Sequence, residues 1–102
     1  MKDKYLKTSD IKWIEIQKGV YEKKCFAHNG GLGISILKIK PNKKIPMHEH
    51  ADTRYNYILK GSMSDQNQTY VKGDIVFNEK GTSHFLESGI GGCEFLLIWN
   101  QS

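Results

Sequence analysis

Short apolar segments recur along the chain and alternate with turns rich in Gly, Asn, Asp and Ser. β-Branched and aromatic residues dominate the apolar segments, as is typical of strands. No segment keeps a helical apolar period over three turns, and many short, regularly spaced strands favour a β-sandwich or barrel. The pattern predicts one all-β domain over residues 1–102, with a polar lead-in at 1–10 and strands at 11–16, 20–26, 32–40, 54–60, 69–71, 74–77, 83–87 and 93–99.

The composition fits a small folded protein and excludes several functional classes. Hydrophobic residues make up 38% of the chain and aromatic residues 11%, which is too apolar for a disordered chain. The formal net charge of +4 comes mainly from scattered lysines, without an Arg-rich arm or an aromatic–basic stripe, so we expect no nucleic-acid surface. No apolar run approaches the ~20 residues that a membrane span needs, so we expect no membrane association.

The two cysteines point to a reducing compartment. Cys25 and Cys93 are not in CxxC spacing, and the charged N-terminal residues do not resemble a signal peptide. We therefore expect a cytoplasmic protein in which both thiols are reduced and buried as small apolar side chains.

The segment "IPMHEHADTRYNYILKG" (45–61) carries two histidines one residue apart. Alternate residues of a strand point to the same face, so His48 and His50 would project together, ~6.6 Å apart along the strand, and could share one ion. Polar side chains continue this face: Asp52, Arg54 and Asn56. Apolar and aromatic side chains occupy the other: Tyr55, Tyr57 and Leu59. Either the polar face lines a cavity, or it is exposed and the tyrosine face is in the core; alternation alone leaves both possible.

A second segment, "KGDIVFNEKGTSHFLESG" (72–89), places His84 after two glycine turns. Together the two segments resemble the cupin family over roughly residues 32–99. The first cupin motif has the form G-x5-HxH-x3/4-E-x6-G and is matched by "HEH" and Gly61. The second has the form G-x5-PxG-x2-H-x3-N and is matched by Gly73, Gly81 and His84, with Glu79 in place of Pro and Ser88 in place of Asn.

The resemblance implies a small double-stranded β-helix, or jelly-roll, barrel. It also implies that His48, His50 and His84 occupy three of the four cupin metal-ligand positions. The fourth, normally Glu, is Arg54 here, whose protonated guanidinium has no lone pair for a metal. The flanks "IKWIEIQKGVYEKKC" and "GGCEFLLIW" are similar to those of ChrR-type cupin domains and dihydroxyacetophenone dioxygenase. The chain thus resembles a small single-domain cupin of the RmlC-like kind.

Three neutral imidazoles suit a divalent ion of Fe, Zn, Ni, Mn or Cu without selecting among them. Because no carboxylate ligand offsets the ion's charge, the site favours a small anionic substrate, which Arg54 would hold as a catalytic residue. Alternatively, Arg54 pairs with Asp52 or Glu49 at the rim. Asp52 is a further possible ligand, and His28 is expected in a loop. The leading hypothesis is a mononuclear metal-dependent dioxygenase; the alternatives are a non-catalytic binding or sensing module and a sugar-acid isomerase or lyase.

Two expectations concern packing. The segments 32–39 and 95–99 are apolar on both faces, and a small barrel has only one interior, so the second face predicts a homodimer. The large aromatic residues are expected in the core: Tyr55, Tyr57, Tyr70, Phe77, Phe85, Phe95 and Trp99.

Overall fold

The computed structural model describes residues 3–28 and 31–100, and it confirms the predicted all-β fold class. Within these ranges the one helical element is a 3-10 turn, η1 (Thr8–Asp10). Eight strands follow, and all of their pairings are antiparallel. They are β1 (Ile14–Gln17), β2 (Val20–Ala27), β3 (Leu32–Ile39), β4 (Lys44–Glu49), β5 (Thr53–Ser64), β6 (Thr69–Val71), β7 (Ile75–Asn78) and β8 (Ser83–Asn100).

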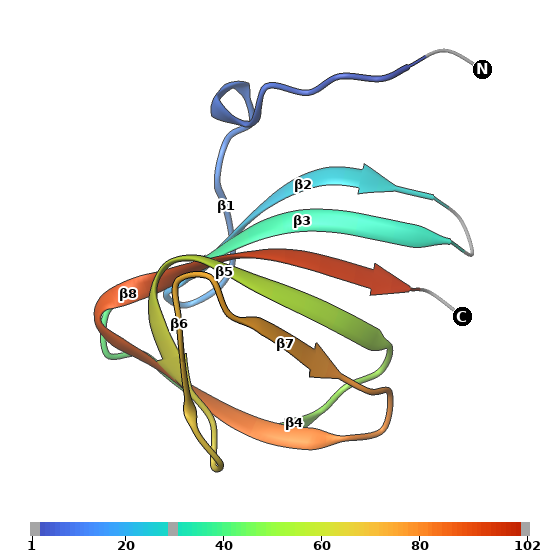
Figure 1. The fold of residues 1–102 in the computed structure, drawn as a ribbon. Coiled ribbons are helices and arrows are strands. Elements are labelled where there is room, and N and C mark those ends of the chain that lie inside the picture. Colours follow the sequence, from blue (N-terminus) through green and yellow to red (C-terminus); the bar gives the residue numbers. More distant parts are fainter. Residues whose placement is uncertain (1–2, 29–30, 101–102) are drawn as a thin grey trace.

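The strands form two layers that share their longest members (Figure 1). The C-terminal part of β8 lies between β3 and the N-terminal part of β5, and this layer continues to β2 and β1 on one side and to β7 on the other. The N-terminal part of β8 pairs with β4, and the end of β5 pairs with β6. Because β5 and β8 pass from one layer to the other, they enclose the space between the layers without closing the sheet.

Glycines allow the two long strands to bend where they cross between layers. Gly61 of β5 pairs with Cys93 of β8 and has a φ of 73°, which L side chains rarely adopt. A Cβ atom at Gly61 would lie 2.0 Å from the carbonyl oxygen of Gly92, so only glycine fits this crossing. The segment "SGIGG" (88–92) therefore bends the chain without ending the strand, and the predicted strands 83–87 and 93–99 are one continuous strand.

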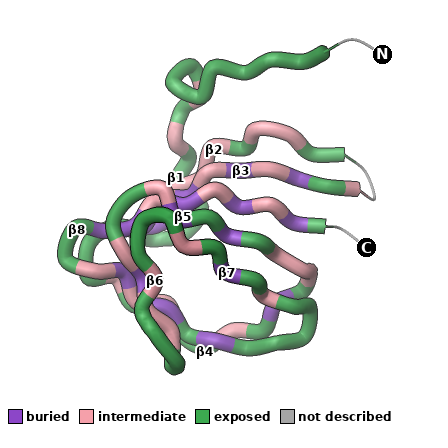
Figure 2. Tube along the Cα trace, viewed as in Figure 1, coloured by how far each residue is buried: buried purple, intermediate pink, exposed green. Residues whose placement is uncertain are grey.

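Buried positions alternate with less buried ones along β3 and much of β8 (Figure 2). Leu37 of β3 and Ile58 of β5 both pair with Phe95 of β8, and all three belong to the core. Gly33 has no side chain because the Trp99 ring occupies that space; a Cβ atom there would lie 2.0 Å from the ring. The core is thus built mainly from the inward faces of β3, β5 and β8, and Val20 of β2 adds to it.

The expectation that all large aromatic residues are in the core was wrong for four of them. Phe95 and Trp99 are buried, and Tyr70 packs partly against the core. The exposed ones all lie on outward faces: Tyr55, Tyr57, Phe77 and Phe85. Their alternating neighbours point inward instead, and several of these, such as Asn56 and His84, are polar and line a cavity between the layers.

Both cysteines are free, and Cys93 is buried whereas Cys25 is only half-buried. The predicted strands did not include β4, although His48 and His50 were expected on a strand. His48 lies on β4, and His50 lies directly after its end. In the described part of the chain, no helix has the length and apolarity needed to cross a membrane.

Candidate metal centre

Three histidines from two neighbouring strands meet between the layers. His48 lies near the end of β4, and His84 lies opposite it at the start of β8. His50 follows β4 directly and is held by backbone hydrogen bonds, its N–H donating to Thr82 and its carbonyl accepting from Gly81. The turn "EKGTS" (79–83) therefore brings His84 next to His48 and His50. The two sequence segments that carried the histidine motifs do converge in space.

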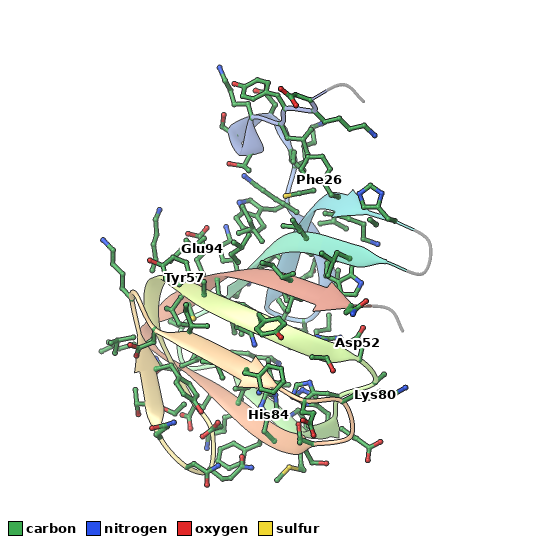
Figure 3. The ribbon with its side chains drawn as sticks, turned by 45° about the vertical axis from the view of Figure 1, so that its right-hand side comes forward. Phe26, Asp52, Tyr57, Lys80, His84 and Glu94 are labelled. Atoms are coloured by element: carbon green, nitrogen blue, oxygen red, sulfur yellow. The ribbon has the colours of Figure 1, made fainter. Side chains whose placement is uncertain are left out.

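The ligand atoms of the three imidazoles all lie within 4.8 Å of one another. The Nε2 atoms of His48 and His84 are 3.1 Å apart, and the ring centroids of His50 and His84 are 4.2 Å apart. His50 and His84 are buried, and His48 is partly exposed. Figure 3 shows His84 on β8, facing the interior between the layers. The described residues contain no fourth Cys, Asp or Glu in this group.

The hydrogen bonds of the histidines leave nitrogen lone pairs for a metal ion. His48 Nδ1 lies 3.0 Å from the carbonyl oxygen of Pro46 and donates to it, which leaves the Nε2 lone pair free to ligate. His50 Nε2 is buried and makes no hydrogen bond to any described residue. A buried polar atom without a partner is costly, and a metal ion would satisfy it. The donor set therefore fits a divalent transition-metal ion.

The surroundings keep two imidazoles neutral, which is the form that binds metals. The pKa of His84 is lowered to about 4, mainly by burial and in part by the neighbouring His50 and His48. Burial likewise lowers the pKa of His50, with smaller contributions from His48 and Arg54. Both groups are thus neutral near pH 7.

Arg54 lies at the start of β5 and lines the same cavity as the histidines. Its Nε donates to Asp52 Oδ1 at 2.8 Å, so the predicted pairing with Asp52 is present. The carboxylate of Asp52 therefore faces Arg54, and Asp52 is not one of the residues whose ligand atoms converge with those of the histidines. A guanidinium has five N–H donors, so four remain after this contact.

Two asparagines form a polar pair next to Arg54. Asn56 is buried and its Nδ2 donates to Asn78 Oδ1 at 2.7 Å. Asn78 of β7 pairs with Arg54 of β5 in the sheet, and both line the cavity. The sequence pattern placed Asn56 on the histidine face but did not single out Asn78. Alternation along β7 could have identified Asn78, because it places Asn78 on the same face as the buried Val76.

These polar groups open onto a cavity of about 500 Å³ between the layers. Its lining includes the three histidines, Arg54, Asn56 and Asn78, together with apolar side chains from both layers. The polar face of β5 thus points inward and the tyrosine face outward, which decides between the two possibilities that alternation left open. His28 lies in the exposed loop after β2, as expected, and belongs to no part of this site.

Solved structures with this fold come from proteins of different functions. The polyketide cyclase RemF from Streptomyces resistomycificus has a TM-score of 0.86 at 21% identity, covering 99% of this chain and 81% of that one. A candidate acetylacetone dioxygenase from Methylibium petroleiphilum PM1 has a TM-score of 0.83 at 14% identity, covering 98% and 78%. The anti-sigma ChrR of Rhodobacter sphaeroides, solved with SigE, has a TM-score of 0.79 at 21% identity, covering 92% and 52%.

At these identities the structural likenesses establish the fold alone. No curated protein sequence matches the chain. A family model, the ChrR Cupin-like domain, matches residues 1–100, which is nearly the whole chain. With the two histidine segments joined in one cavity of a small antiparallel barrel, the chain belongs to the ChrR cupin-like family.

Proposed function

We propose that the protein is a mononuclear metal-dependent dioxygenase that acts on a small anionic organic substrate. One observation carries the proposal: three histidine ligand atoms lie within 4.8 Å of one another in a cavity that also contains Arg54. A site that supplies only neutral ligands leaves the +2 charge of the ion uncompensated, which favours an anionic substrate oxygen. The fold of the candidate acetylacetone dioxygenase is compatible with this chemistry.

Each residue has a distinct role in this proposal. His48, His50 and His84 would hold the ion, and Arg54 would hold the anionic group of the substrate through bidentate hydrogen bonds. Asp52 keeps Arg54 oriented by accepting from its Nε. When bound, the ion would supply Lewis acidity and, if it is iron, the redox chemistry with O2. The apolar walls of the cavity would limit access of water to the substrate.

The test is metal analysis followed by oxygen uptake. Protein purified without chelator should contain close to one divalent ion per chain, and the iron form should consume O2 with acetylacetone or a related β-diketone. Loss of both metal and oxygen uptake in His50→Ala would support the proposal. A parent protein that binds none of Fe, Zn, Ni, Mn or Cu under supplementation contradicts it.

A second candidate function is a non-catalytic sensing module that binds a metal or small molecule. The match to the ChrR Cupin-like domain favours it, since ChrR itself was solved in complex with SigE. Metal binding without turnover, combined with a metal-dependent change in binding to a protein partner, would support this function over catalysis. A cytoplasmic setting remains a prediction from the sequence for either function.

We further propose that the protein is a homodimer. Its outer face, defined here as the uncharged outward positions of four adjacent strands, consists of Ile34, Ile36, Tyr55, Tyr57, Ile75, Phe77, Leu96 and Ile98. These residues pair directly across the strands, for example Ile34 with Ile98 and Tyr57 with Leu96. Tyr57, labelled in Figure 3, is 42% exposed, and a contiguous apolar surface of this kind is typical of an interface.

Light scattering tests the dimer. Tyr57→Lys places a charge in the middle of the outer face and should convert the dimer to a monomer. Ile90→Lys is the matched control, because Ile90 is 89% exposed but lies outside this face. A monomeric mass for the parent protein at micromolar concentration contradicts the proposal.

A further inference from the structure

The cavity changes from polar to apolar along its length, and the strand register shows where. Arg54 of β5 pairs with Asn78 of β7. Two residues further along β5, on the same face, Asn56 pairs with Val76. On the opposite layer, His84 pairs with His48, and two residues along β8 Leu86 pairs with Ile45. The lining therefore becomes apolar two residues, or ~6.6 Å, beyond His84 on β8. On β7 it becomes apolar at Val76, two residues before Asn78, while β5 still carries the polar Asn56 opposite Val76.

The far end of the cavity is mainly apolar. Its apolar lining comes from six strands and consists of Ile16, Val20, Leu37, Ile39, Ile45, Met63, Leu86 and Phe95. Gln17, next to Ile16, and Tyr70, paired with Met63, are the polar side chains beside them. Arg54 is the one charged residue in the described lining. Apolar walls of this extent offer few hydrogen bonds to a hydroxylated ligand. They would instead gain free energy by removing an alkyl or aryl group from water.

The polar end carries donors suited to a carboxylate or an enolate. Arg54 uses Nε for Asp52, and the terminal nitrogens of its guanidinium remain as donors. Asn78 accepts through Oδ1 from Asn56, and its own amide N–H groups remain as donors. Because Arg54 and Asn78 are paired neighbours in the sheet, these donors lie side by side.

From this division we infer that the substrate is an amphiphile with an acidic head and an apolar tail several carbons long. The head, a carboxylate or enolate oxygen next to the histidines, is held by Arg54 and Asn78. The tail lies along the apolar end toward β1. The inference deepens the proposed function and rests on it for the position of the head. It disfavours sugar acids, because most of their hydroxyl groups would be buried among apolar side chains with few hydrogen-bond partners.

The test is the affinity of a chain-length series. Straight-chain 2-oxo acids of three to ten carbons are titrated calorimetrically into the Zn(II)-loaded protein, since Zn(II) supports no redox turnover. Each added methylene that enters the cavity should tighten binding by about fourfold, until the cavity is filled. Gluconate, with six carbons, should bind much more weakly than the six-carbon 2-oxo acid. Affinity that does not depend on chain length, or equal affinity for gluconate, overturns the inference.

Two variant pairs locate the ends of the ligand. Ile16→Asn, at the β1 end of the cavity, should weaken the longest acids and leave the three-carbon acid unchanged. Ile14→Asn is its control on the same strand, since Ile14 is exposed and does not line the cavity. Arg54→Met should weaken every member of the series by the same factor, roughly ten- to hundredfold, whereas Lys72→Met, in an exposed turn, should not. Identical behaviour of the Ile16 and Ile14 variants overturns the placement of the tail.

The result is separable from that of the proposed function. If the protein binds no metal, the same series is titrated into the metal-free protein, where the dependence on chain length reports the apolar end alone. If the protein binds no metal but its affinity still rises with chain length, the inferred amphiphile stands and only the metal-dependent function is contradicted. A flat series in a protein that binds one Zn(II) contradicts only the amphiphile.

Discussion

The Nε2 atoms of His48 and His84 lie 3.1 Å apart, although the residues are 36 positions apart in the chain. The β4–β8 pairing places them directly opposite each other. At this separation the two nitrogens share one proton, or both turn their lone pairs to a common ion. Because His50 adds a third nitrogen that has no partner among the described residues, an ion satisfies all three where a proton satisfies two.

The first prediction is that each of the three histidines is required for tight metal binding. His50→Ala or His84→Ala removes one of three ligands and should lower the affinity for Zn(II) by more than about 100-fold. The measurement is a competition with a chelator of known affinity, followed by elemental analysis. His28→Ala is the matched control, because His28 is an exposed loop histidine. Full metal occupancy in His50→Ala would show that the assignment of ligands is wrong.

The second prediction concerns the position where cupins normally carry a glutamate. Arg54→Glu should add a carboxylate ligand, tighten the metal, and weaken an anionic ligand at least tenfold by reversing the local charge. Arg54→Gln is the control, since it removes the cation without adding a ligand. It should weaken the anion and leave metal affinity unchanged. The measurement is parallel titration of Zn(II) and of 2-oxohexanoate, and equal metal affinity for the two variants would refute the prediction.

The regular spacing of short strands predicted the fold class. His84 was joined to His48 and His50 through the resemblance of both segments to the cupin motifs, because local spacing cannot bring together residues 36 positions apart. Strand alternation puts His48 and His50 on one face, and the turn before β8 delivers His84. Which face of β5 points inward depends on the opposite layer, which alternation does not reveal. Here the three histidines, Arg54 and Asn56 make one end of the interior polar, and Tyr55 and Tyr57 point outward, against the usual preference of aromatic residues.

The continuity of β8 was missed for a related reason. Its segment "SGIGG" has the composition of a turn, and local sequence cannot distinguish a turn from a bend within a strand. What decides is the partner: β5 bends at Gly61 next to Gly92, so both strands keep their pairing through the corner.

The third prediction follows from this crossing. Gly61→Ala should destabilise the protein by about 3–5 kcal/mol, because the added methyl group meets the Gly92 carbonyl and the residue must keep a positive φ. Gly73→Ala is the matched control: it has a φ of 94°, but a Cβ atom there would meet nothing within 4 Å, so it should cost only about 1–2 kcal/mol. Urea unfolding of both variants measures the difference. Similar losses at the two positions would show that the close approach has no energetic consequence.

The fourth prediction concerns acid stability and rests on Asp65, in the turn between β5 and β6. Its Oδ2 accepts from the hydroxyl of Tyr70 at 2.6 Å, and its Oδ1 accepts from the backbone N–H groups of Asn67 and Gln68. Burial alone raises the pKa of Asp65, but these three hydrogen bonds outweigh it and lower the pKa below 3.8. A carboxylate with a lowered pKa in the folded state stabilises the protein fully above its unfolded pKa. That stability is lost as the pH falls through 3.8 toward the folded value.

Asp65→Asn should therefore lower the free energy of unfolding by about 1 kcal/mol at pH 7, and the difference from the parent should shrink below pH 4. Tyr70→Phe removes one of the three donors and should reproduce part of the effect, while Asp3→Asn, in the exposed segment before β1, should have none. Urea unfolding at pH 7, 5, 4 and 3 measures all four proteins. Because the hydrogen bonds stabilise only the charged form, a parent–variant difference that stays constant from pH 7 to pH 3 would mean that the carboxylate charge of Asp65 does not stabilise this turn.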